Sequence, residues 1–291
     1  ARDGWARESA LASDDPRRNY RDDNHKPELL VALSERFESL SGLRPVSDTL
    51  SLLEALDDSD GVRQLRARLS AEGDALRDVI AWVLGGEART EVEEIIAAIV
   101  AASTRADAGE WGTTLRAIAG VARTYPGDPG VVVALLMNHV VLKRGEGVFL
   151  RAGLLHAYLS GLGVEIMAAS DNVLRGGLTP KRIDVPELLS ILDTTPGEVP
   201  VLRGEGEGPI TSYPVPVPDF ALERVVLDGA PIGLEISGPT MVLATAGEVA
   251  VASNTGNEVA LQVGTVAFAD SAEGSLTVSG VGEVFIAGPG R

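Results

Sequence analysis

The last third of the chain restricts the fold most, because it repeats one short pattern. From about residue 200 to the end, apolar runs alternate with turn residues: "ERVVL", "PIGLEIS", "TMVLATA", "EVAVAS", "EVALQV", "TVAFA", "SLTVS" and "EVFIA". Short β-branched runs separated by turns roughly every 8–12 positions are typical of strands and predict a sandwich or barrel. The region has no histidine and no lysine. We therefore expect a structural β domain there, without metal or phosphate chemistry.

A different period precedes it, from about residue 36 to 125. In "GDALRDVIAWVLGG" the apolar residues Leu76, Ile80 and Val83 are spaced by three and four before two glycines, which predicts an amphipathic helix. "SDTLSLLEALDD" and "TEVEEIIAAIVAAS" follow the same rule, with Ser47 and Thr90 as expected N-caps. The turn residues of "TYPGDPG" at 124–130 end this helical region.

Length and charge limit the classes of protein to which the chain can belong. Its 291 residues exceed one ordinary domain, so we expect two or three units. A net charge of −17 opposes binding to nucleic acid, whose phosphates require a basic face. No apolar stretch reaches the roughly 18 residues of a membrane span. With no cysteine in the chain, a metal must bind histidine, carboxylate or amide groups. The first ten residues lack an apolar signal segment, so the expected location is cytoplasmic.

One segment reverses the acidic balance. Residues 141–182 contain only three acidic side chains, Glu146, Glu165 and Asp171, against six basic ones: Lys143, Arg144, Arg151, Arg175, Lys181 and Arg182. An anionic substrate would be repelled by the chain as a whole and would need such a local cationic pocket.

The stretch "NHKPE" at 24–28 has two readings. Asn24 could cap a helix that starts at Pro27, with Glu28 near its positive end. Alternatively, Glu28 is a metal ligand and Lys26 binds phosphate or stabilises a transition state. The residues alone leave both readings open.

A second polar cluster lies at 156–175. If "LLHAYL" is a strand, His156 and Tyr158 share a face, and a following strand "VEIMA" projects Glu165 in the same way. Glycines 161 and 163 would permit a hairpin between them. Asp171 and Arg175 lie just beyond, so we expect one concavity with several reactive side chains. His139, inside an apolar run, is expected to be a structural residue with satisfied partners.

These segments also carry a family resemblance. "YRDDNHKPE" resembles the signature Y-x-D-x-N-H-K-P-E, and "HAYLSGLGVEIMAASDNVLRGGLTPK" resembles a longer one, H-A-Y-x-x-G-x-x-x-E-x-M-A-x-S-D-N-V-x-R-A-G-x-T-P-K, of type I mannose-6-phosphate isomerases. One departure is Gly176, where alanine is usual. No Walker loop, GxSxG elbow or HExxH motif supports a competing enzyme class.

The resemblance implies a fold and its boundaries. The expected fold is a mixed α and β chain with a cupin or jelly-roll β core, an inserted helical domain and a second β module. Residues 1–35 and 126–187 would form the remaining part of the catalytic β domain, 36–125 the helical insert, and 188–291 the C-terminal β domain.

It also implies an activity and its residues. The family interconverts mannose 6-phosphate and fructose 6-phosphate with one Zn²⁺, and the chain is expected to be a monomer. The family's zinc ligands match Glu28 and His156; its active-site residues match Lys26, Tyr158, Glu165, Asp171 and Arg175. Two further ligands, from a Q-x-H motif ahead of N-H-K-P-E, have no counterpart, since no glutamine precedes Gln64. We therefore expect a chain lacking the N-terminal part of the catalytic domain.

The expected reaction moves a proton between adjacent carbons through an enediol. Glu165 is the candidate base; alternatively, it orients a metal ligand. Arg175 would stabilise the enediolate or bind phosphate. The rival function is a non-catalytic sugar-phosphate-binding or regulatory cupin protein. A cupin of unrelated function would need histidines close together in sequence, which the three histidines here are not.

Overall fold

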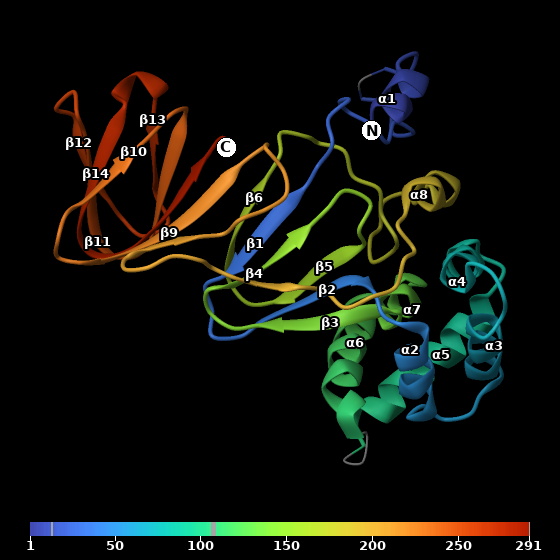
Figure 1. The fold of residues 1–291 in the computed structure, drawn as a ribbon. Coiled ribbons are helices and arrows are strands. Elements are labelled where there is room, and N and C mark those ends of the chain that lie inside the picture. The colour runs from blue at the N-terminus through green and yellow to red at the C-terminus, as the bar shows by residue number, and fades with distance from the viewer. Residues whose placement is uncertain (13, 106–108, 291) are drawn as a thin grey trace.

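The computed structural model describes residues 1–12, 14–105 and 109–290. Most of the chain forms three units: a two-sheet β module, a helical region inserted into it, and a C-terminal β module at the opposite end from the helices (Figure 1). This mixed α and β architecture confirms the fold class expected from the sequence.

The first β module consists of two antiparallel sheets. One has the order β6-β1-β4-β7, from β6 (Gly163–Met167), β1 (Glu28–Ala32), β4 (Glu146–Leu150) and β7 (Val201–Arg203). The other has the order β3-β2-β5, from β3 (Met137–Leu142), β2 (Phe37–Leu43) and β5 (His156–Ser160). Both sheets contribute to one buried cluster: Leu30, Ala32, Phe37, Val140, Leu142, Val148 and Leu150. The module is therefore a sandwich with a shared core.

The hairpin expected between residues 156 and 167 is wrong. Strand β5 pairs with β2, whereas β6 pairs with β1 in the other sheet. Gly161, with φ of +113°, lets the chain cross from one sheet to the other, and a side chain at this position would collide with Phe37. A turn that permits a hairpin does not require one, because pairing depends on which strands lie alongside.

The helical region lies between β2 and β3. It contains α2 (Val46–Glu54), α3 (Asp60–Leu69), α4 (Ala75–Leu84), α5 (Arg89–Ser103), η1 (Gly109–Trp111), α6 (Gly112–Thr124) and α7 (Gly130–Leu135). Leu76, Ile80 and Val83 are buried in its core, as their spacing predicts. Both expected N-caps are wrong: Ser47 and Thr90 lie inside helices that start one residue earlier.

The boundaries of the units differ from the expected ranges in two places. Strand β2 lies within 36–125, expected to be helical, because its side chains complete the sandwich core. Strand β7 and helix α8 (Val185–Ile191) lie within 188–291 or at its edge, yet β7 pairs with β4 and α8 contacts α4. They belong with the first two units. A short helix, α1 (Arg2–Glu8), precedes β1.

The C-terminal module is a seven-stranded sheet built around two long strands, β11 (Thr240–Ser253) and β14 (Ser275–Gly288). The remaining strands are β8 (Ile210–Ser212), β9 (Ala221–Asp228), β10 (Ile232–Glu235), β12 (Glu258–Leu261) and β13 (Val266–Ala269), with a turn of 3₁₀ helix, η2 (Ser271–Glu273). Each long strand joins two runs expected to be separate. Where the two long strands pair at Gly247 and Gly282, a side chain on Gly247 would collide with the backbone of Val281 and Gly282. Glycine therefore allows both strands to continue through this position.

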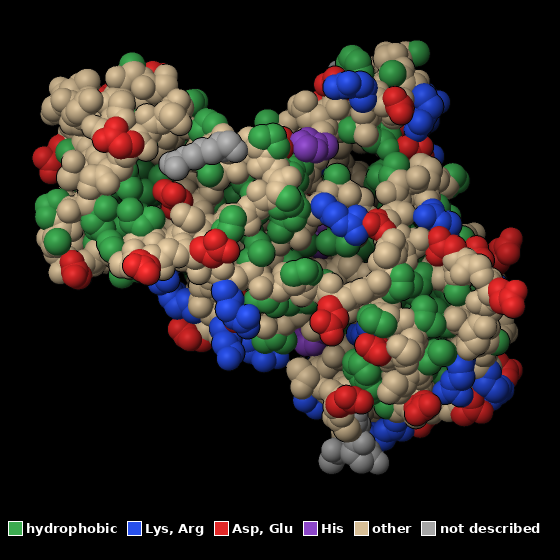
Figure 2. Space-filling view, viewed as in Figure 1, with side chains coloured by type: hydrophobic (Ala, Val, Ile, Leu, Met, Phe, Trp, Pro, Cys, Tyr) green, Lys and Arg blue, Asp and Glu red, His purple; other side chains and the backbone are tan. Residues whose placement is uncertain are grey.

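Charge is distributed unevenly over the surface. Acidic and basic side chains intermingle over the helical region on the face in Figure 2, and the C-terminal module shows few basic ones. From Val225 to Gly290 the sequence has no lysine or arginine. Within the described ranges, no helix combines the length and apolarity needed to cross a bilayer.

Candidate active site

The "NHKPE" segment starts a strand, not a helix. Its last residue, Glu28, is the first of β1 and pairs with Leu150 on one side and Met167 on the other. The carbonyl of Pro27 accepts a hydrogen bond from the amide of Ala168, which extends this alignment. The helix-start reading is therefore wrong, because neighbouring strands satisfy the backbone that a helix cap would have satisfied.

Glu28 places a charged group inside the module. Only 6% of its surface is exposed. Its Oε1 lies 3.2 Å from Lys26 Nζ, and its Oε2 lies 3.2 Å from His156 Nε2. Burial opposes ionisation, but the hydrogen bond and charge of His156 and the charge of Lys26 outweigh it, so the pKa of Glu28 lies below its usual value.

His156, the first residue of β5, is oriented toward Glu28. Its Nδ1 lies 3.1 Å from the carbonyl oxygen of Leu154, which makes Nδ1 the donor and leaves Nε2 facing the carboxylate. Burial lowers the pKa of His156, but the hydrogen bonds to Glu28 and Leu154 raise it above its usual value overall. Histidines that bind metals commonly donate one ring N–H to a backbone carbonyl, as His156 does to Leu154, and use the other nitrogen as the ligand.

Tyr158 and Glu165 meet across the two sheets. The Tyr158 hydroxyl donates to Glu165 Oε1 at 2.5 Å, and its ring packs edge-on against Phe37 with centroids 5.5 Å apart. Burial and this hydrogen bond raise the pKa of Tyr158. Partial burial raises the pKa of Glu165, and the charge of Glu28 adds to the rise, against the hydrogen bond from Tyr158. A carboxyl whose pKa is raised toward neutrality suits proton transfer.

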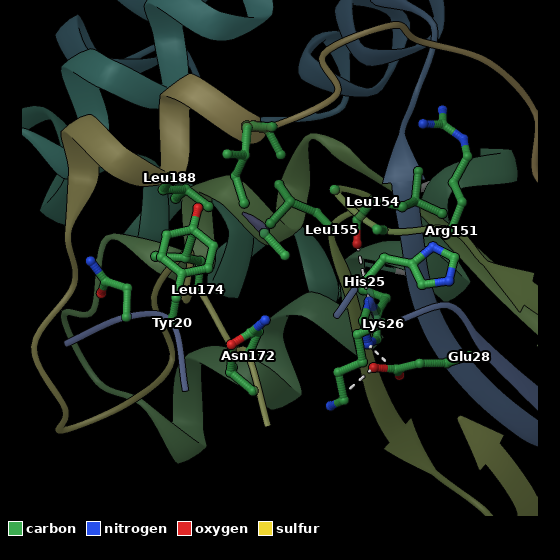
Figure 3. Close-up of a pocket in the computed structure, with 18 of the residues that line it drawn as sticks. Tyr20, His25, Lys26, Glu28, Arg151, Leu154, Leu155, Asn172, Leu174 and Leu188 are labelled. Atoms are coloured by element: carbon green, nitrogen blue, oxygen red, sulfur yellow. Dashed lines mark hydrogen bonds and ion pairs between the residues drawn. The ribbon is translucent and has the colours of Figure 1, made fainter. Parts of the chain in front are cut away.

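A pocket of about 230 Å³ opens beside Glu28 and His156. Figure 3 shows Lys26 and Glu28 at one end, while Tyr20 and Leu188 lie across the opening. Its polar lining includes Asn19, Asn24, His25, Arg151 and Asn172, and its apolar lining includes Leu154, Leu155, Leu174, Ile191 and Leu192. A concave site with a mainly apolar wall and a few convergent polar groups is typical of small-molecule binding.

Comparisons with known proteins identify the family. The chain is 33% identical to mannose-6-phosphate isomerase of Escherichia coli and 35% identical to that of Salmonella typhimurium, over 97% of this chain and 71% of each relative. A crystal structure of zinc-bound mannose 6-phosphate isomerase matches this chain with a TM-score of 0.85 and 31% identity. The match covers all of this chain and 73% of the isomerase chain in that structure. The chain belongs to the mannose-6-phosphate isomerase family. No family model matches it.

Two residues of this family member could hold a metal. Glu28 and His156 offer a carboxylate oxygen and an imidazole nitrogen that converge on one point. In the described ranges, no group of three or more His, Cys, Asp and Glu side chains could hold an ion. A carboxylate and an imidazole suit Zn²⁺, which usually takes four ligands.

The isomerase-family signature residues Asp171 and Arg175 flank, in sequence, a segment that lines the pocket. Neither lines it, although Asn172, Val173 and Leu174 do. The backbone amide of Asp171 donates to Asp22 Oδ2 at 2.8 Å, and the Asp171 side chain is exposed. Arg175 is half-buried and has no ion pair or side-chain hydrogen bond within the described part of the chain.

The other two histidines have partners elsewhere. His139 contacts Glu38 at 2.9 Å and has a nearly buried side chain, which confirms its structural reading. His25 points away from Glu28 and lies 2.8 Å from Asp219.

The sequence reasoning missed Asp22 and Asn172, whose side chains connect the two signatures. Both belong to the quoted motifs, and their side chains each make several hydrogen bonds. The signal available was their type: Asp and Asn in a loop commonly bind neighbouring backbone groups.

Proposed function

We propose that this protein is a zinc-dependent aldose–ketose isomerase that interconverts mannose 6-phosphate and fructose 6-phosphate. The observation that carries the proposal is the convergence of Glu28 and His156 beside the Tyr158–Glu165 pair, in a member of the mannose-6-phosphate isomerase family. The rival function, a non-catalytic sugar-phosphate-binding protein, has no comparable support, because the relatives that the chain resembles are named as isomerases.

Glu28 and His156 would hold the zinc. The hydrogen bond between His156 Nδ1 and Leu154 fixes the ring, and Lys26 steadies the other oxygen of Glu28. When bound, zinc supplies a Lewis acid that polarises sugar oxygens. The solved zinc-bound isomerase supports this choice of metal.

Glu165 is our candidate for the group that moves the proton. The isomerisation removes a proton from one carbon and returns it to its neighbour, so one carboxylate can act as base and then as acid. The Tyr158 hydroxyl holds one oxygen of Glu165, and Glu28 lies close enough to raise the pKa of Glu165 through its charge. The raised pKa of Glu165 makes its carboxylate a stronger base and brings its protonated form closer to neutral pH, which suits a group that takes up a proton and returns it.

The charged ends of the substrate require cations. Lys26 lies at the pocket and would stabilise the developing oxyanion, while Arg175, which has no ion-pair partner in the described ranges, would bind phosphate or the enediolate. Asp171, the remaining signature residue, would help to orient the sugar hydroxyls.

The test combines metal content with an assay of fructose 6-phosphate formation from mannose 6-phosphate. Glu28→Gln and His156→Asn should each lower both zinc content and turnover, turnover by about a hundredfold or more. The control His25→Asn removes an imidazole that faces Asp219 and should keep the zinc. Absence of turnover in the zinc-loaded, folded chain would instead favour the non-catalytic alternative.

The monomeric state and the cytoplasmic location stay predictions. Light scattering of the purified chain measures the first, and cell fractionation measures the second.

A further inference from the structure

Two loops that are far apart in the sequence are fastened to each other beside the pocket. The first is residues 21–24, just before Lys26 and Glu28; the second is residues 169–172, just before Arg175. Neither is part of a helix or strand. Their positions therefore depend on side-chain hydrogen bonds, because no regular backbone pairing holds them.

Asp22 supplies one side of this connection. Its Oδ1 accepts from the Ser170 hydroxyl at 2.8 Å and from Asn172 Nδ2 at 3.1 Å, and its Oδ2 accepts from the Asp171 amide at 2.8 Å. It also accepts from the amide of Asn24 at 3.0 Å. All these groups are donors directed at a carboxylate, so both oxygens are needed as acceptors.

Asn172 supplies the other side. Its Nδ2 donates to the backbone carbonyls of Asp22 and Asn24, each at 3.0 Å, and its Oδ1 accepts from the amide of Arg21 at 2.7 Å. Asn24 adds a bond from its Nδ2 to the carbonyl of Ala169 at 2.8 Å. Asn172 thus needs both a donor and an acceptor, which aspartate or leucine at this position would not provide.

The connection fixes the distance between two sets of signature residues. Lys26 and Glu28 follow the first loop, and Asp171 and Arg175 belong to or follow the second. The chain from Ala168 to Asp184 contains no helix or strand. Its far part is held independently, because Asp128 Oδ1 accepts from the amide of Leu178 at 3.1 Å.

We propose that Asp22 and Asn172 are positioning residues of the isomerase, which together align the segment carrying Asp171 and Arg175 with the Glu28 and Lys26 end of the pocket. This inference rests on the proposed function. Neither residue would contact the reacting carbons; both act by holding other residues. Misplacement of a substrate-binding group by about 1 Å can cost about a hundredfold in rate, so the effect should be large.

The test compares Asp22→Ala, Asp22→Asn and Asn172→Ala with Asp23→Ala in the zinc-loaded full chain. Asp23 is the matched control: it neighbours Asp22, and among the described residues its side chain has one ion-pair contact, at 4.0 Å from exposed Arg2. Alanine at 22 or 172 should lower kcat/KM for mannose 6-phosphate by about 10- to 100-fold, with zinc content unchanged. Asp22→Asn should give an intermediate kcat/KM, because the amide keeps one acceptor oxygen but replaces the other with a donor.

A double variant tests whether the two residues act as one unit. If they do, Asp22→Ala combined with Asn172→Ala should be little worse than the worse single variant. Hydrogen exchange of the 169–175 backbone should accelerate in each single alanine variant and remain unchanged in Asp23→Ala.

The outcomes separate this inference from the function on which it rests. Faster exchange with kinetic constants equal to those of Asp23→Ala would overturn the positioning role and leave a structural one. Unchanged exchange would overturn the connection itself. If the parent chain has no turnover, the proposed function fails, and the positioning role is then judged by the affinity for inorganic phosphate, which Asp22→Ala and Asn172→Ala should weaken and Asp23→Ala should not. If Asp22→Ala does not fold, Asp22→Asn and Asn172→Ala give the same readouts.

Discussion

The two β modules of this protein gather different kinds of side chains. In the first, Glu28 contacts His156 and Tyr158 contacts Glu165, so that four reactive side chains meet on the sandwich. In the second, the interior is apolar throughout its main cluster: Val225, Leu227, Leu234, Val242, Ala244, Val249, Val251, Leu261, Ala269, Leu276, Val278, Val284 and Ile286. Similar antiparallel sheets thus serve chemistry in one place and stability in the other.

The one buried carboxylate of the C-terminal module illustrates the difference. Glu283 is 4% exposed, and each of its oxygens is paired: Oε1 with Arg144 and Thr245, and Oε2 with Arg224. Arg144 comes from the turn between β3 and β4, so this group ties the two modules together. Glu28 is equally buried, but its neighbour His156 is a group that can exchange its partner for a metal. Glu283, whose oxygens are held by arginine and threonine side chains, is therefore read as structural. Glu28, whose partner is a histidine that can bind a metal, is read as functional.

The largest expected effect is on the stability of the C-terminal module. Leu227→Ala should lower the free energy of unfolding by about 2–5 kcal/mol, because it opens a cavity at a side chain only 2% exposed. Val226→Ala, on the same strand but facing outward at 43% exposure, should change it by less than about 0.5 kcal/mol. Urea unfolding followed by circular dichroism measures both, since the three tryptophans, Trp5, Trp82 and Trp111, lie outside this module. Equal losses would contradict the assignment of an apolar interior.

In the first module we expect a loss of turnover without a loss of stability. Glu165→Gln should reduce turnover by about a hundredfold or more if Glu165 moves the proton. It should not lower stability, because the raised pKa of Glu165 shows that the folded protein disfavours its charge. Steady-state kinetics and thermal unfolding give the two readouts, with Glu35→Gln as a control that removes a charge from an exposed position. Near-normal turnover would remove Glu165 from the proposed role.

Acid should weaken the junction through Glu283. Burial raises its pKa, but hydrogen bonds from Thr245 and Arg224 and the arginine charges leave it below the usual value. Its contribution is therefore present above the pKa of the unfolded chain and is lost as the pH falls through the lower folded pKa. Glu283→Gln should cost about 2 kcal/mol at pH 7 and flatten the loss of stability as the pH falls below the usual range of a carboxyl pKa. Urea unfolding at several pH values tests this; a variant with the parent's pH slope would contradict it.

The smallest effect is expected for Tyr158→Phe. It removes the hydroxyl that orients Glu165 while keeping the ring against Phe37, so turnover should fall by about tenfold with little change in stability. The apparent pKa of the pH–rate profile should move upward, because the variant loses the Tyr158 hydrogen bond that lowers the pKa of Glu165. An unchanged rate and pH profile would show that the hydroxyl does not act on the carboxylate.

Local pattern was sufficient for much of the fold. The spacing of Leu76, Ile80 and Val83 predicted a helix with these residues buried, and alternation predicted that His156 and Tyr158 lie on one face of a strand. It was insufficient where a strand's partners decide its limits. Strand β2 was expected to be helical. Strands β11 and β14 were each expected as two strands, because a glycine such as Gly247 within a long strand looks like a turn in the sequence.

The sequence by itself determined which residues are reactive, which family they resemble and which faces of helices and strands are apolar, since these follow from residue type and spacing. The tertiary structure decided which reactive groups meet. Tyr158 and Glu165 are joined from different sheets, and Glu28 is joined to His156 from distant parts of the chain. It also connected Asp22 with Asn172 and left Arg175 outside the residues that line the pocket. Distances between distant segments depend on the packing of the whole chain, and no local spacing encodes them.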